Sequence, residues 1–204
     1  AVIIDPNKDF SPDPIAQDMR RLEDSLREVV KPHLQLPGKD LRILNLACGR
    51  CDEAESLIKL GSELVGTPTQ VEMVAADIRI REIRQARERF GHLPAKFLIE
   101  DATKIDAHSE LGDDFGLVFL RHQNFWHGQE LWKKIFDQGT AKLDKNGLLV
   151  ITSYFDKEHH LALQALEELG MEVIESRRTK GSRALSDAPG KSVDRWVAVL
   201  RRKA

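Results

Sequence analysis

The stretch LRILNLACGRCDE, residues 41–53, is the strongest indication of the fold in this sequence. Its first six residues are almost continuously apolar, as a parallel strand covered on both faces requires. Ala47, Cys48 and Gly49 then form a turn of small residues, which lets the backbone approach a ligand. Asp52 is expected to cap a following helix, whose free N–H groups point back toward the turn. This order predicts a nucleotide-binding corner in an open α/β sheet.

Strand and helix patterns alternate along the chain. Strands are predicted at residues 41–46, 70–76, 96–100, 115–120, 147–152, 171–177 and 193–201. Helices are predicted at residues 15–30, 52–61, 80–90, 129–143 and 157–169. The last two strands are expected to pair as an antiparallel hairpin. The fold class is therefore predicted to be α/β: a doubly wound, mostly parallel seven-stranded sheet with a C-terminal antiparallel hairpin and helices on both faces.

The turn resembles the first motif of class I S-adenosylmethionine-dependent methyltransferases, an acidic residue followed by alternate glycines. In this chain the pattern falls on Asn45, Ala47, Gly49 and Cys51, so one glycine is kept. Asn replaces the carboxylate, Ala the first glycine and Cys the last. The terminal hairpin is a second point of resemblance, and the likeness covers roughly residues 40–201. It implies one domain at 1–204, with an N-terminal helical extension at 1–39 and a Rossmann-like core at 40–204.

Two acidic residues follow the second and third predicted strands. A carboxylate at Asp77 is placed to bind both ribose hydroxyls of an adenosine. Methyltransferases resembling this chain put an acidic residue at the place of Asp101, against the adenine amino group, and the N–H of Ala102 suits a ring nitrogen. An Asp after a strand is also a common turn former. The resemblance implies an S-adenosyl-L-methionine site formed by Asn45, Ala47, Cys48, Gly49, Asp77, Ile78, Asp101, Ala102 and Arg121.

The end of the fourth predicted strand reads RHQNFWH, residues 121–127. Methyltransferases that modify exocyclic base nitrogens carry an Asn or Asp, two prolines and an aromatic residue there, and this chain has no such tetrad. Phe125 and Trp126 can cover a sulfonium with an aromatic face. His122, His127 and Tyr154 are candidates for a catalytic base. Methyl transfer mainly requires alignment and exclusion of water, so the sequence leaves the catalytic residue unassigned.

Bulk properties restrict the partners. The chain has 204 residues and a formal net charge of −2, which gives no electrostatic attraction to nucleic acid or an anionic membrane. No apolar stretch approaches the ~20 residues of a membrane span, and a cytoplasmic protein is expected. His159-His160 lacks companion ligands, so no metal site is predicted. The expected acceptor is a small molecule or a protein side chain, and the oligomeric state is not determined.

Three alternatives remain. Cys48 and Cys51 form a C-x-x-C at a helix N-terminus, where a thiol redox centre is physically sensible. The chain contains two cysteines in total, too few for a metal site. A dinucleotide site would require G-x-G-x-x-G and an acidic residue about 20 positions later, whereas Asp77 lies further on. The third alternative is a methyltransferase fold that has lost catalysis and binds a partner or metabolite.

Overall fold

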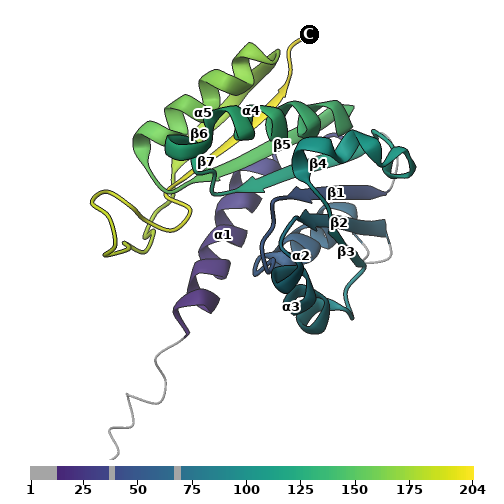
Figure 1. Ribbon diagram of the computed structural model, residues 1–204, viewed down its shortest axis with the longest axis horizontal. Coiled ribbons are helices and arrows are strands. Elements are labelled where there is room, and N and C mark those ends of the chain that lie inside the picture. The colour runs from purple at the N-terminus through teal and green to yellow at the C-terminus, as the bar shows by residue number, and fades with distance from the viewer. Residues whose placement is uncertain (1–12, 37–39, 67–69) are drawn as a thin grey trace, which may run out of the picture.

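The computed structural model describes residues 13–36, 40–66 and 70–204. Its strands form one sheet in the order β3-β2-β1-β4-β5-β7-β6 (Figure 1). The strands are β1 (Leu41–Leu46), β2 (Val71–Asp77), β3 (Ala95–Ile99), β4 (Phe115–Arg121), β5 (Leu143–Ser153), β6 (Met171–Arg178) and β7 (Trp196–Arg202). The α-helices are α1 (Pro14–Val30), α2 (Ala54–Val65), α3 (Ile80–Phe90), α4 (Phe125–Lys142) and α5 (Asp156–Glu168), and short 3₁₀ helices η2 (Ala102–Ala107) and η3 (Ser109–Leu111) follow β3.

Strand β1 lies in the middle of the sheet and pairs in parallel with both β2 and β4. Strand β7 runs antiparallel to both β5 and β6. The predicted fold class, a mostly parallel seven-stranded sheet with a terminal antiparallel hairpin, is confirmed. The chain order reverses between β1 and β4, and ligands in such sheets bind beyond the carboxyl ends of the strands at this point.

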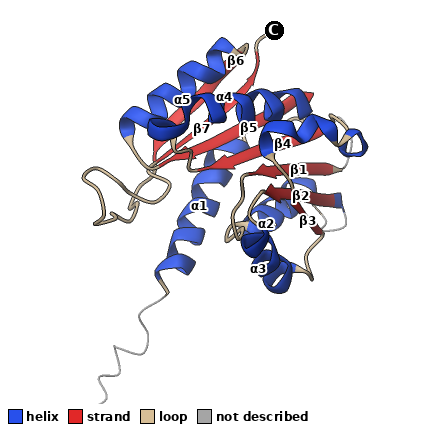
Figure 2. Ribbon diagram, viewed as in Figure 1, coloured by secondary structure: helices blue, strands red, loops and turns tan. Residues whose placement is uncertain are grey.

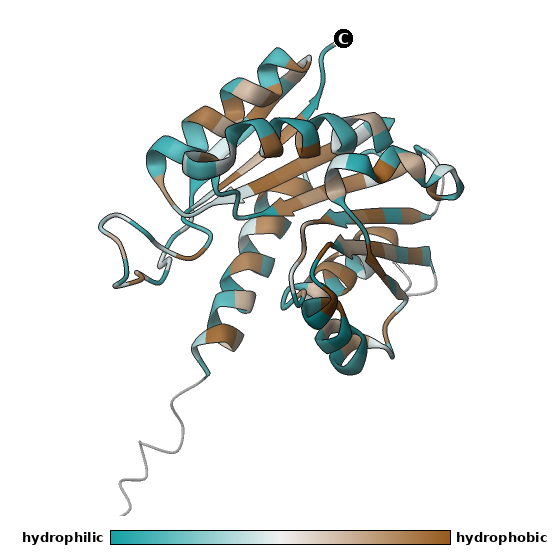
Figure 3. Ribbon diagram, viewed as in Figure 1, coloured by the Kyte–Doolittle hydropathy of each residue, from teal (hydrophilic) through white to brown (hydrophobic). Residues whose placement is uncertain are grey.

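Helices cover both faces of the sheet, as Figure 2 shows. One hydrophobic core lies between the sheet and α1, α2 and α3, and includes Leu26, Leu57 and Ile83. The other lies between the sheet and helices α4 and α5, and includes Phe136 and Leu166. The central strands are hydrophobic along most of their length (Figure 3), because both of their faces are covered.

Helix α1 confirms the helix predicted over residues 15–30. Asp13 caps it, since its side chain accepts a hydrogen bond of 3.0 Å from the N–H of Ile15. The helix packs against α2 and β7 on its buried stripe. Residues 1–12 lie outside the described residues. Within the described ranges, no helix is both long and apolar enough to cross a membrane.

Several predicted boundaries were wrong. Helix α2 begins at Ala54 rather than residue 52, and Asp52 does not cap it. The helix has Glu53 at its N-cap position, and the Asp52 carboxylate binds Arg50 and Arg89 instead. Helix α4 begins at residue 125, four residues before the predicted start at 129, and its helical backbone is interrupted at Gly128. Strand β5 begins at residue 143 rather than 147, directly after α4.

Candidate functional site

The turn after β1 has left-handed backbone at alternate residues. The φ angles are 54° at Ala47, 59° at Gly49 and 58° at Cys51. These are the positions at which the resemblance expects glycines, so the turn keeps the conformation although two glycines are missing. Side-chain-bearing residues enter this region at a cost of roughly 1–2 kcal/mol each. The surrounding structure therefore holds the turn in place more than its local sequence does.

Asp77 binds the turn from the end of β2. Its Oδ2 accepts a hydrogen bond of 2.7 Å from the N–H of Gly49. Its Oδ1 accepts bonds of 2.9 Å and 3.0 Å from the N–H and Nε of Arg79, whose guanidinium covers the carboxylate. Burial alone would raise the pKa of Asp77, but these hydrogen bonds outweigh it and the pKa is lowered. The residue is thus an anion placed beside the turn.

Asn45 lies beneath the turn and is fully buried. Its Nδ2 donates a hydrogen bond of 2.8 Å to Oε1 of Glu53. The other oxygen of Glu53 lies 3.5 Å from Nη1 of Arg121, at the end of β4. The carboxylate that the motif usually has at position 45 is thus replaced by an amide that holds a carboxylate eight residues later. No pattern in the sequence indicated Glu53.

Arg121 joins β4 to the loop between β6 and β7. Its Nε and Nη2 donate hydrogen bonds of 3.0 Å and 2.8 Å to the carboxylate of Asp194. Thr152, beside Arg121 in β5, donates another of 2.7 Å. Burial alone would raise the pKa of Asp194, but the charged Arg121 helps hold it well below its usual range. This buried network fixes one side of the site.

His122 is held rigidly at the end of β4. Its Nε2 accepts a hydrogen bond of 2.8 Å from the N–H of Asp194, and its ring stacks on Tyr154 with centroids 3.5 Å apart. Burial lowers the pKa of His122 against the opposing pull of the Asp194 carboxylate, so the neutral ring is favoured. Since Nε2 is already an acceptor here, His122 is a wall of the site rather than a free base.

Three cavities adjoin one another above the strand ends. The adenosine-side cavity, about 420 Å³, is lined by Asp77, Ile78, Asp101, Ala102, Leu131, Trp132 and others. The turn cavity, about 320 Å³, is lined by residues 47–53 with Arg79, Glu82, Arg121, His122 and Tyr154. The outer cavity, about 310 Å³, is lined by His122, Asn124, Trp126, His127, Tyr154, Phe155, Glu158 and Lys191. His122 lines all three, so the cavities lie next to one another around its ring, and together they are called the strand-end path.

The structure brings nearly all of the predicted site residues to this path. Ala47, Cys48, Gly49, Asp77, Ile78, Asp101, Ala102 and Arg121 line the first two cavities, and His122, His127 and Tyr154 line the outer one. Asn45 supports the turn from below instead of lining a cavity. Phe125 is buried against Phe136 in the core, whereas Trp126 is 42% exposed at the outer cavity.

Sequence reasoning missed Glu158, although a signal for it was present. Glu158 shares a helix face with Ala162, Ala165 and Leu166, a spacing that places all four inward. It is 3% exposed, and burial raises its pKa to about 7 against the opposing effects of the Trp126 backbone and Lys191.

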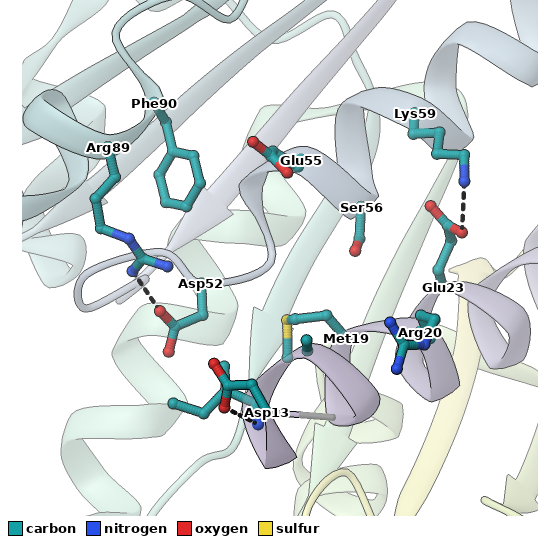
Figure 4. Close-up of a pocket in the computed structure, with 12 residues that line it drawn as sticks. Asp13, Met19, Arg20, Glu23, Asp52, Glu55, Ser56, Lys59, Arg89 and Phe90 are labelled. Atoms are coloured by element: carbon teal, nitrogen blue, oxygen red, sulfur yellow. Dashed lines mark hydrogen bonds and ion pairs between the residues drawn. The ribbon is translucent and has the colours of Figure 1, made fainter. Parts of the chain in front are cut away.

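A further cavity of about 350 Å³ lies between α1, α2 and α3 (Figure 4). Four of its charged side chains bind one another in pairs: Lys59 lies 3.3 Å from Glu23, and Arg89 binds Asp52. Asp52 also borders the turn cavity, which lies on the other side of the same loop. The strand-end path is the stronger candidate site, because it lies where the chain order of the parallel strands reverses.

The surroundings of Cys51, the buried member of the C-x-x-C pair, disfavour a thiolate there. Cys48 and Cys51 are both free thiols. The Cys48 side chain, burial and the Glu53 carboxylate all raise the pKa of Cys51, which opposes formation of a thiolate. The buried Cys51 side chain lies beneath the turn, with Sγ 3.4 Å from Nδ2 of Asn45.

No protein-family model matches the sequence, and no curated protein matches it either. Solved structures do resemble it. A methyltransferase from Clostridium acetobutylicum, described as S-adenosylmethionine-dependent, has a TM-score of 0.64 at 10% identity, covering 95% of this chain and 94% of that one. The N-methyltransferase NodS from Bradyrhizobium japonicum has a TM-score of 0.61 at 14% identity, covering 95% and 99%. A TehB-like S-adenosylmethionine-dependent methyltransferase from Corynebacterium glutamicum has a TM-score of 0.59 at 17% identity, covering 91% of this chain and 87% of that one. The chain has the fold of the class I methyltransferases.

Proposed function

We propose that this protein is an S-adenosyl-L-methionine-dependent methyltransferase acting on a small molecule or a protein side chain. The observation that carries the proposal is the strand-end path, three adjoining cavities above the strand ends with His122 common to all of them. Such a path suits an adenosine at one end, a methionine group at the turn and an acceptor at the other end.

The adenosine-side cavity has the chemistry that an adenosine needs. Asp77 presents a carboxylate to ribose hydroxyls, as in other sheets that bind nucleosides at this point. Thr103 donates hydrogen bonds of 2.9 Å and 2.7 Å to Oδ1 of Asp101, which leaves Oδ2 for an adenine amino group. Ile78, 64% exposed, and Trp132 offer apolar surface for the base.

The turn cavity fits the methionine end. A Cβ built on Gly49 would lie 3.0 Å from Nη2 of Arg79, so the absence of a side chain there lets that guanidinium lie close to the turn. Arg121 and Glu53 line the same cavity and offer opposite charges to a carboxylate and an ammonium group. When bound, the sulfonium group supplies an activated methyl group, and the role of the protein is to align the acceptor and exclude water.

Arg79 covers the carboxylate that the ribose would use. Its guanidinium is 3.0 Å from Asp77 and its side chain is 60% exposed. The carboxylate of this pair is buried, so the ribose hydroxyls would have to replace the hydrogen bonds that the exposed guanidinium gives up. We infer that Arg79 swings away from Asp77 when the cofactor binds.

Calorimetric titration with S-adenosylmethionine and S-adenosylhomocysteine tests the proposal, with NADH as control. We expect micromolar binding of the first two and none of NADH. Asp77→Ala should lose most of the affinity, whereas Asp106→Ala, an exposed acid of η2, serves as the matched control. Absence of binding to the wild-type protein would contradict the proposal. Binding without methyl transfer to any acceptor class would instead favour a protein that has lost catalysis.

A further inference from the structure

The outer cavity contains a buried carboxylate that is hydrogen-bonded by the Trp126 backbone but forms no ion pair with a cation of the described residues. Glu158 is 3% exposed and lies at the start of α5, where it lines this cavity. Among the residues described by the structure, no Lys, Arg or His forms an ion pair with it. Other acids nearby are paired: Asp194 with Arg121 and Asp156 with Arg195. A buried carboxylate without a cation is costly, and a bound ligand can supply the missing charge.

The charged groups around Glu158 belong to several elements. Lys191, from the β6–β7 loop, faces the cavity but forms an ion pair of 2.7 Å with Asp187. Lys157, its neighbour in α5, places Nζ 5.0 Å from the centre of the Trp126 ring. His127 and Tyr154 line the same cavity from α4 and the end of β5. None of them neutralises the Glu158 carboxylate directly.

The remaining walls are aromatic. Trp126, Tyr154 and Phe155 line the outer cavity, and Tyr154 also lines the turn cavity beside it. At about 310 Å³ the outer cavity is at the lower end of the range for small-molecule sites, ~300–1,000 Å³. Aromatic faces attract both apolar groups and cations. The cavity therefore suits a compact ligand with an apolar body and one positive charge.

We propose that the outer cavity binds a small amine as methyl acceptor and that Glu158 is the catalytic residue that takes its proton. This inference rests on the proposed function. The Glu158 carboxylate pairs with the ammonium group of the acceptor and accepts one proton, which frees the nitrogen lone pair. A C–N bond then forms as the methyl–sulfur bond breaks, and the electrons of that bond stay on sulfur. The methylated ammonium leaves with its charge, and Glu158 releases the proton to water.

The proton-accepting role agrees with the acidity of the group. Burial raises the pKa of Glu158 to about 7, so the carboxyl group exchanges its proton near neutral pH. His122, the sequence-based candidate nearest the turn, is less suited because its Nε2 already accepts the Asp194 N–H. His127 is exposed at the cavity mouth and is positioned by no hydrogen bond from a side chain of the described residues.

Binding experiments test the proposal without relying on turnover. S-adenosylhomocysteine is added first, and calorimetry then compares benzylamine, phenethylamine and their neutral counterparts benzyl alcohol and 2-phenylethanol. We expect the amines to bind at least about tenfold more tightly than the alcohols. Amine affinity should increase from about pH 6 to about pH 8, as Glu158 ionises. Glu158→Gln should lose about 30-fold in amine affinity, because it removes one partner of a buried charge pair. Glu168→Gln, an exposed position of the same helix, should leave amine binding unchanged.

The outcomes separate the two proposals. If S-adenosylhomocysteine fails to bind, the proposed function fails and the acceptor role of Glu158 fails with it. If S-adenosylhomocysteine binds the wild type and Glu158→Gln equally but amines show no advantage over alcohols, the amine proposal alone is overturned. Equal amine affinity in Glu158→Gln and wild type also overturns it. The comparison of amines with alcohols on the wild-type protein needs no variant. It therefore tests the preference for amines even if Glu158→Gln folds poorly.

Discussion

Glu158→Gln should change how the stability of the protein depends on pH. The substitution keeps the shape of the side chain and removes its titration. In the folded protein burial raises the pKa of Glu158 from its ordinary value of 4.5 to about 7. A carboxyl group with a raised pKa binds more protons in the folded state than in the unfolded state. Its contribution to stability is therefore present at low pH and is lost as pH rises from about 4.5 to about 7.

The size of this loss follows from the two pKa values. A difference of about 2.5 between them corresponds to about 3 kcal/mol, at about 1.36 kcal/mol per pKa unit. Part of the loss has already occurred at pH 5, so between about pH 5 and about pH 8 the wild type should lose roughly 2–3 kcal/mol that Glu158→Gln retains. Other titrating groups, such as His159, whose pKa burial lowers to about 4, are present in both proteins and cancel in the difference.

Urea unfolding at the two pH values, followed by circular dichroism, measures this difference. The slopes of the unfolding curves should agree between variants, so that changes in midpoint report stability. Glu168→Gln provides the matched control, because it removes the same charge from an exposed position of α5. Parallel pH profiles for wild type and Glu158→Gln would refute the reasoning, since they would show that the Glu158 carboxyl group is solvated rather than buried.

Three other substitutions test the turn and its supports. Ala47→Gly should stabilise the protein by roughly 0.5–1 kcal/mol in urea unfolding, because relief of the left-handed backbone exceeds the added entropy of the unfolded chain. Arg79→Ala should raise affinity for S-adenosylhomocysteine up to about fivefold in calorimetry, by freeing Asp77; weaker binding would mean that Arg79 itself holds the cofactor. Asp194→Ala should cost about 3–5 kcal/mol of stability by leaving Arg121 buried without its partner, and a loss under 1 kcal/mol would show that water replaces the carboxylate.

The sheet could be predicted from the sequence because its strands are buried on both faces and therefore apolar over most of their length. The ends of elements were harder to predict. Gly128 breaks the helical backbone within α4. The sequence pattern therefore predicted a helix from residue 129, whereas the helix begins at Phe125. The start of β5 was also misplaced: the strand begins at Leu143 and includes residues 144–146, whose polar side chains are typical of a loop. Tertiary pairing with β4 decides that boundary, and pairing is invisible in a local pattern.

The candidate site was predictable where it follows strand ends. Asp77 and Asp101 could be placed from chain order, because the carboxyl ends of parallel strands meet at one edge. Asp194 could not, since it lies in a loop 73 residues from its partner Arg121 and no local pattern links them. Glu158 shares the buried face of its helix with Ala162, so its inward position was readable, but the lack of a cation beside it required the structure.

The tie between Arg121 and Asp194 also bears on the order in which the protein assembles during synthesis. Residues 121 and 152 leave the ribosome before residue 194. The Arg121 guanidinium and the Thr152 hydroxyl can therefore bind the Asp194 carboxylate only after the loop between β6 and β7 has been synthesised. The nascent chain can therefore pair β1, β2 and β4 early, while the walls around His122 take their final form only after β7 has joined β5. The binding site is therefore complete only once β7 has paired with β5. Cofactor that binds at this stage would stabilise the folded state.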